Sequence, residues 1–276
     1  MKRAVFDAYV FQRQTAVDLG AQYGKSGRWI REQIDHASIS MPCVMPITTP
    51  IAADMTFWGR GYGVCVFRSP TLKQNLWWKE SATETPSIYA KGLQDLQKQG
   101  FTVTGAVIDG KRGVARVFET QGIPVQYCQF HQMKTVTTYL TRKPKTEAGK
   151  ELRALTLTLP YTTEALFHEA LLSWRERHDA FLNERTIVSH RRRGWEYTHR
   201  RIRAAYRSLV TNLSQLFTYQ RYPELHLPNT TNCLDGMFSQ VKNKLAVHRG
   251  LRRDRRYKII SMILRGKAKT ASRFFH

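Results

Sequence analysis

Two aspartates beside apolar segments are the residues of this chain whose type and spacing best suit chemistry. Asp54 lies within the apolar residues 51–58, and Asp109 follows the apolar residues 103–108. Such segments are typical of buried strands, where a carboxylate is costly unless a cation faces it. Two carboxylates from neighbouring strands would form the two halves of a divalent-metal site. We therefore expect Asp54 and Asp109 to bind metal together.

Net charge indicates the class of substrate. The chain of 276 residues has 44 Lys and Arg against 21 Asp and Glu, which gives a formal net charge of +23. A field of this size attracts polyanions, and nucleic acid is the first candidate. In so basic a protein, the natural metal-dependent substrate is a phosphodiester. Ribosomal and membrane-surface proteins are the alternatives, but ribosomal proteins are usually shorter and poorer in Trp and Tyr.

The sequence has neither a signal-peptide pattern nor an apolar run of membrane-spanning length. We therefore expect a soluble, cytoplasmic protein that makes no membrane contact. Its cysteines are scattered and form no Cys-x-x-Cys pair, standing at Cys43, Cys65, Cys128 and Cys233. This spacing argues against a disulfide framework and against a complete zinc ribbon.

The first segment has the pattern of a helix-turn-helix. Residues 15–23 and 27–37 suit two short helices, with Gly24 in the turn between them. Basic side chains gather on the turn and the second helix, and we expect three of them to contact DNA, namely Lys25, Arg28 and Arg31. An ordinary helical hairpin is the alternative. Prolines at positions 42, 46 and 50 then mark a linker and the start of a new domain.

Residues 51–141 show strands and helices in a definite order. Periodicity and turn residues predict three strands, followed by a helix, a strand, a helix, a strand and a helix. The predicted bounds are strands 51–58, 62–68 and 75–79, helix 87–99, strand 101–108, helix 112–120, strand 123–128 and helix 131–141. This order is typical of the ribonuclease H-like fold, an α/β fold whose first and fourth strands are neighbours. Asp54 and Asp109 would then lie side by side.

Residues 146–219 have a helical pattern throughout, with long helices predicted at 164–184 and 196–216. Between these two helices, residues 190–194 are expected to form a basic loop. We predict phosphate contacts for the arginines of this loop and for the start of the next helix, a set made up of Arg191, Arg192, Arg193 and Arg200. The alternative is a solvated face without a partner.

A third carboxylate is expected downstream, because a ribonuclease H-like nuclease needs one from a helix packed against the first and fourth strands. An amphipathic helix begins near Asn232, and Asp235 in its first turn is the best-placed acid. Glu196 and Glu224 fit less well, since one follows the basic run and the other lies in a Pro-bounded loop. The alternative role of Asp235 is structural, because Asn232 and Asp235 have capping-box spacing and an acid in a first turn favours the helix dipole.

Three sequence blocks resemble the Mutator-type transposases of bacterial insertion sequences, a branch of the DDE/DDD transposases. The blocks are Ala53-Asp54-x-Thr-Phe-Trp-Gly, then Val107-Ile-Asp109-Gly-Lys-Arg-Gly with Cys128-Gln-Phe-His131, and last Thr230-Thr-Asn-Cys-Leu-Asp235-Gly. The resemblance implies that Asp54, Asp109 and Asp235 form the metal-binding catalytic triad. Asp235 stands where the family commonly has Glu. Cys128 and His131 match a motif characteristic of the group.

The resemblance also implies an organisation and an activity. A helix-turn-helix segment (1–44) would precede a ribonuclease H-like core (45–142), an all-helical insertion (143–228) and C-terminal helices that complete the core (229–276). The implied activity is cleavage and joining of transposon ends by in-line phosphoryl transfer with two Mg²⁺ or Mn²⁺ ions. The implied partners are double-stranded DNA, as terminal inverted repeats and as target, and further copies of the chain in a homodimer or larger assembly.

Alternatives stay open for His131 and for the chain as a whole. His131 could orient a metal ligand or contact the scissile phosphate, or it could form a buried structural pair with Cys128. The chain could be a helix-turn-helix DNA-binding protein that descends from a transposase and has no catalytic activity. It could also be a ribonuclease H-like nuclease that cuts DNA without joining it.

Overall fold

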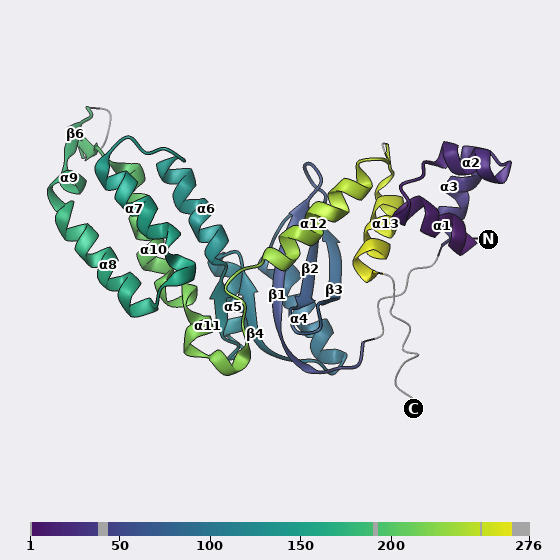
Figure 1. The fold of residues 1–276 in the computed structure, drawn as a ribbon, viewed down its shortest axis with the longest axis horizontal. Helices are drawn as coiled ribbons and strands as arrows, with labels where there is room; N and C mark the ends of the chain where they lie inside the picture. The colour runs from purple at the N-terminus through teal and green to yellow at the C-terminus, as the bar shows by residue number, and fades with distance from the viewer. Residues whose placement is uncertain (1, 38–43, 190–192, 249, 267–276) are drawn as a thin grey trace.

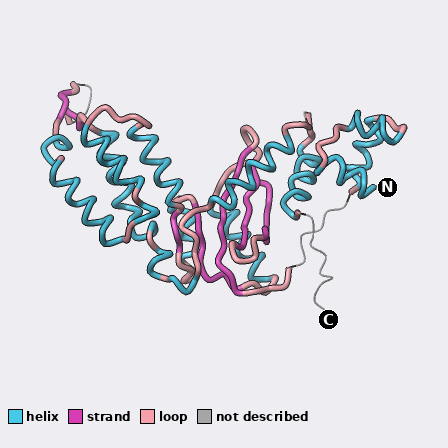
Figure 2. The backbone as a smooth tube through the Cα atoms, viewed as in Figure 1, coloured by secondary structure: helices cyan, strands magenta, loops and turns pink. Residues whose placement is uncertain are grey.

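A five-stranded mixed sheet stands at the centre of the molecule, with helices on both of its faces (Figures 1 and 2). The computed structural model describes residues 2–37, 44–189, 193–248 and 250–266. The strands are β1 (Thr48–Phe57), β2 (Gly63–Ser69), β3 (Gln74–Ser81), β4 (Thr102–Ile108) and β5 (Val125–Tyr127). Their spatial order is β3-β2-β1-β4-β5, with β1 antiparallel to β2 and parallel to β4. The fold class is therefore mixed α/β.

The order of elements predicted for the core is confirmed. Three helices connect and follow the later strands, and they are α4 (Pro86–Lys98), α5 (Arg112–Glu119) and α6 (Gln129–Leu140). The first and fourth strands are neighbours, as predicted. β1 is buried along nearly its whole length, which explains its continuous apolar run, because helices cover both faces of the sheet.

The two faces of the sheet carry different helices. Ile51 and Ala53 pack in a core that includes α4 and α5, whereas Ala52 packs in a second core with α12 (Asn232–Leu245) and α13 (Arg253–Arg265). Successive side chains of a strand point to opposite faces. Asp54, two residues after Ala52, therefore points to the face that α12 covers, and Figure 1 shows α12 lying along that face.

The region between α6 and α12 forms a helical bundle beside the sheet (Figure 1). Its helices are α7 (Glu147–Leu157), α8 (Glu164–Arg177), α9 (Asp179–Asn183), α10 (Arg200–Leu216) and α11 (Thr218–Arg221), with short 3₁₀ turns η1 (Leu159–Tyr161) and η2 (Pro223–Leu225). The predicted helix over 164–184 is divided at His178 into α8 and α9.

The prediction that residues 146–219 are helical throughout is wrong at one place. A two-stranded hairpin, β6 (Arg185–Ile187) and β7 (Trp195–Tyr197), follows α9, so the helix predicted from 196 begins only at Arg200. Aromatic and β-branched residues favour strands, and here cation–π contacts strengthen that preference. The guanidinium of Arg185 lies 4.0 Å from the centre of the Trp195 ring, and that of Arg203 lies 3.6 Å from Tyr197.

The two helices and the glycine turn predicted for the first segment are confirmed. Its two helices are α2 (Ala16–Tyr23) and α3 (Gly27–His36), and an additional helix, α1 (Lys2–Phe11), precedes them. Gly24 ends α2 in the left-handed conformation with φ of 62°. A Cβ at Gly20 would come within 2.6 Å of the Lys25 carbonyl oxygen, so the close approach of the turn requires glycine.

The N-terminal helices are docked on the C-terminal helix α13. Asp35 accepts two hydrogen bonds from the Arg255 guanidinium, at 2.8 and 2.6 Å, in a bidentate ion pair. The ring of Tyr9 stacks on that of His248, with 3.9 Å between the ring centres. Residues of α1, α2 and α3 share one hydrophobic core with α12 and α13. Within the described residues, no helix is both long and apolar enough to cross a membrane.

Candidate metal centre

Three segments that are distant in the sequence bring carboxylates to one end of the sheet. Asp54 lies on β1, Asp109 follows the last residue of β4, and Asp235 lies in the first turn of α12. Ala52 of β1 pairs with Val107 of β4 in parallel register, which places Asp54 and Asp109 level with each other two residues further on.

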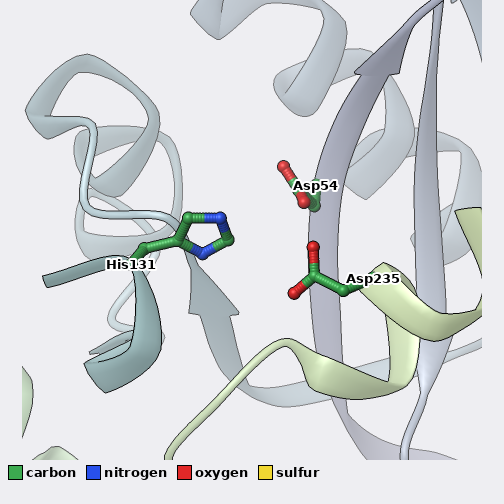
Figure 3. A group of neighbouring side chains, drawn as sticks. All are labelled: Asp54, His131 and Asp235. Atoms are coloured by element: carbon green, nitrogen blue, oxygen red, sulfur yellow. The ribbon is translucent and has the colours of Figure 1, made fainter. Parts of the chain in front are cut away.

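Two groups of possible ligands share one residue. Asp54, Glu84 and Asp109 form the first group, and Asp54, His131 and Asp235 form the second. Within each group the ligand atoms lie within 4.8 Å of one another, and Asp54 belongs to both. Figure 3 shows His131 from α6 and Asp235 from α12 pointing toward Asp54. The structure thus brings together all three predicted aspartates and His131, and it adds Glu84.

Glu84 lies in the loop between β3 and α4, and its side chain is only 9% exposed. The Tyr89 hydroxyl donates a hydrogen bond of 2.7 Å to one carboxylate oxygen, and the Lys111 ammonium pairs with the other. Lys111 also lies 3.8 Å from Asp109. Sequence reasoning missed Glu84 because an acid just before a helix that starts with proline has an ordinary local role. Only the tertiary fold turns its side chain toward Asp54.

Burial makes this cluster electrostatically costly without a cation. It raises the pKa of Asp54 from 3.8 to about 7, helped by the nearby charge of Asp109 and opposed by a hydrogen bond from the Met55 amide. The pKa of Asp109 is also raised, first by burial and then by Glu84, while Lys111 acts in the opposite direction. Bound divalent ions would remove this penalty by neutralising the carboxylates.

One carboxylate oxygen of Asp235 is free to bind an ion. Its Oδ2 atom is buried and has no hydrogen-bond partner among the described residues. The capping-box interpretation is wrong, because Thr231 is the N-cap residue of α12 and Asn232 is already the first helical residue, but Asp235 does lie in the first turn, where a negative charge favours the helix dipole. A buried carboxylate oxygen without a donor is costly, and a metal ion would satisfy it. The residues present therefore fit a divalent ion.

Cys128 and His131 form a hydrogen bond at the edge of this cluster. A hydrogen bond with the Cys128 thiol raises the pKa of His131 to about 9. Burial alone would raise the pKa of Cys128, but hydrogen bonds from His131 and Thr231 outweigh it and lower that pKa. Both interpretations of His131 therefore describe part of its environment. The His131 side chain is hydrogen-bonded to Cys128, and its ring faces the carboxylates of Asp54 and Asp235 (Figure 3).

A cavity of about 330 Å³ opens onto the cluster. Its lining includes the five candidate ligands together with Phe238, Ser239 and Lys242 of α12. Lys242 follows Asp235 by two helical turns, so both residues lie on the same face of α12. The seven-residue spacing can be read from the sequence. It indicates a role for Lys242 only once Asp235 is known to lie in the site. The Lys242 side chain, a cation in the cavity beside the candidate metal ligands, suits an anionic substrate.

The predicted DNA-contacting residues lie elsewhere on the surface. Lys25, Arg28 and Arg31 are exposed on the turn and on α3, and Arg28 pairs with Glu32 at 3.1 Å. Arg193 is exposed, and Arg200 pairs with Glu196 at 2.9 Å. The β6–β7 hairpin stands at the end of the helical bundle away from the sheet (Figure 1). The structure does not bring either basic set to the cavity, and Arg191 and Arg192 lie outside the described residues.

Comparison with known proteins adds no family assignment. Neither the protein-family models nor the curated proteins contain a match to this chain.

Proposed function

We propose that this protein is a DNA transposase of the Mutator type, with a ribonuclease H-like core that a helical insertion interrupts. The observation that carries the proposal is that Asp54 belongs to two ligand groups at once. A shared carboxylate with further ligands on either side is the arrangement that two-metal phosphoryl transfer needs. A formal net charge of +23 supports DNA as the phosphodiester substrate.

Each residue has a specific role in this proposal. Asp54, Glu84 and Asp109 would hold one divalent cation, and Asp54, His131 and Asp235 would hold a second. Mg²⁺ or Mn²⁺, when bound, would activate a water or a DNA 3′-hydroxyl and stabilise the oxygen that leaves phosphorus. His131 faces the carboxylates of Asp54 and Asp235. In its neutral form the ring can coordinate a cation, and in its charged form it can contact a phosphate.

Substrate binding would come from the residues around the cluster. Lys242 lines the same cavity as the carboxylates and can contact the phosphate that undergoes attack. The helix-turn-helix would read the terminal inverted repeat, because its exposed Arg28 and Arg31 can enter a major groove. The arginines near the β6–β7 hairpin would contact phosphates without reading sequence. Two copies of the chain would hold two transposon ends.

A strand-transfer assay tests this function against its alternatives. The substrate is a duplex that carries the inverted repeats of the DNA flanking the gene, offered with a target plasmid and Mg²⁺. A transposase cleaves the end and joins its 3′-hydroxyl to the plasmid. A nuclease would release cleaved ends without joined product, and a non-catalytic binding protein would shift the duplex in a gel without cleaving it. Either of these outcomes would refute the proposed activity.

A further inference from the structure

We propose that Cys128 is a positioning residue, whose sulfur fixes the start of α12 and so places Asp235 and His131 in the metal cluster. This inference rests on the proposed function, since it assigns a role within the same site. It concerns a residue that does not line the cavity and cannot itself reach the substrate.

The contact is made by a single buried sulfur atom. The Thr231 backbone amide and the Thr231 hydroxyl both lie 3.3 Å from the Cys128 Sγ atom and donate to it. The same hydroxyl lies 3.4 Å from the His131 Nδ1 atom. Cys128 and Thr231 are completely buried, so water does not compete for these hydrogen bonds.

Cys128 and Thr231 each connect directly to a ligand-bearing segment. The Cys128 amide donates a 2.8 Å hydrogen bond to the carbonyl of Ile108, the residue before Asp109. The Thr231 carbonyl accepts from the amide of Asp235 at 3.2 Å and so closes the first turn of α12. Cys128 therefore links the end of β4 to the start of α12, with its backbone amide at one end and its sulfur at the other.

The contact between Cys128 and Thr231 matters because of where it lies along the chain. The chain leaves the core at the end of α6 and returns only after the whole helical bundle, so the start of α12 must be located independently. A second pair beside the first supports the same junction. The Gln129 amide donates to the Asn229 carbonyl at 2.9 Å, and the Asn229 side chain donates to the Gln129 side chain at 3.0 Å. Both pairs hold the segment that precedes α12 against the start of α6.

Sulfur suits this position better than oxygen. A thiol is tolerated in a fully buried site, and its large sulfur can accept from two donors at longer distance. Serine would keep an acceptor, but its shorter bond to Cβ would draw that acceptor away from Thr231. Alanine would leave the Thr231 amide without a partner.

The test compares Mn²⁺ affinity and amide hydrogen exchange in the full-length protein. Calorimetry should show Mn²⁺ binding weakened roughly 10- to 100-fold in Cys128→Ala, the range typical of partners that orient metal ligands. Cys128→Ser should recover part of this loss. Amides in the first turn of α12 should exchange faster in Cys128→Ala, while those of α13 keep their protection. Ser69→Ala is the matched control, because it removes a buried hydrogen bond of 2.7 Å to Thr49 away from the cluster.

The contradicting results are distinct. Wild-type affinity and unchanged exchange in Cys128→Ala would overturn the role of the sulfur, as would an equal loss in Ser69→Ala. If Cys128→Ala does not fold, Thr231→Val must show the same two effects in milder form, and their absence would overturn the proposal. Failure of the wild-type chain to bind Mn²⁺ would refute the proposed function, and the exchange measurement would still decide the role of Cys128.

Discussion

A carboxylate oxygen of Asp235 lies within 4.8 Å of a carboxylate oxygen of Asp54, although the entire helical bundle separates the two residues in the chain. Asp54 is presented by a central strand and Asp235 by the first turn of a helix that covers the same face of the sheet. Elements from both ends of the chain are therefore needed to complete the cluster.

Asp235→Asn should eliminate metal-dependent cleavage while changing stability little. Asp235 does not cap α12, so the expected loss is its favourable interaction with the helix dipole, about 0.3–1 kcal/mol. Asp235→Glu should retain part of the activity, because it restores the charge with one more methylene. Nicking of a transposon-end duplex and thermal unfolding measure the two effects. Full activity of Asp235→Asn would remove this residue from the site.

Asp54→Asn should have opposite effects on folding and on metal binding. The substitution removes a buried negative charge that destabilises the metal-free protein, so the melting temperature without metal should rise. The same variant should lose the stabilisation that Mn²⁺ gives the wild-type protein. Calorimetric melting with and without Mn²⁺ tests both statements. A lower melting temperature without metal would contradict the electrostatic account.

Stability of the metal-free protein should fall as pH rises from 3.8 to about 7. Burial raises the pKa of Asp54 from 3.8 to about 7, so folded protein keeps a proton that the unfolded chain has already lost. Stability from this proton is present at low pH and is lost as pH passes through about 7. The pKa of His131, raised from 6.5 to about 9, acts in the same direction at higher pH, while the lowered pKa of its partner Cys128 acts in the opposite direction. Asp54→Asn should flatten the part of the profile near pH 7, and an unchanged profile would contradict this assignment.

Much of the core was predictable because its signals are local. The continuous apolar segments that contain Asp54 and precede Asp109 come from strands buried on both faces, and their parallel pairing follows from the order of elements. Glu84 was not predictable, since its approach to Asp54 depends on where the loop after β3 turns in space. The β6–β7 hairpin was missed because its contacts, such as that of Arg203 with Tyr197, come from the neighbouring helix.

Glu84→Gln should weaken Mn²⁺ binding although sequence reasoning gave this residue no role. The change removes one carboxylate of the first ligand group but can still accept the hydrogen bond from Tyr89. Glu119→Gln, at an exposed position outside the cavity, is the matched control with the same chemistry. Calorimetric titration of both variants gives the comparison. Equal Mn²⁺ affinities would show that Glu84 does not hold metal.

Loss of Arg28 or Arg31 should reduce sequence-specific binding. If α3 enters the major groove, replacing either residue with Ala should cost about 1–3 kcal/mol at the cognate repeat and relax base preference there. Replacing Arg191, Arg192 and Arg193 with Ala should instead weaken binding to all sequences and flatten its salt dependence. Fluorescence titrations on cognate and random duplexes separate the two cases. Equal effects of both sets on both duplexes would remove the helix-turn-helix as the reader of sequence.

The most direct test of the metal-centred account compares DNA cleavage by the wild-type chain and by Asp54→Asn on the same transposon-end duplex. We predict Mg²⁺-dependent strand cleavage by the wild-type protein, complete loss of cleavage with a chelator, and no cleavage by Asp54→Asn. The variant should still bind the duplex at least as tightly, because a negative charge near phosphate is removed. Cleavage that persists in Asp54→Asn, or that continues when divalent ions are removed, would contradict the account.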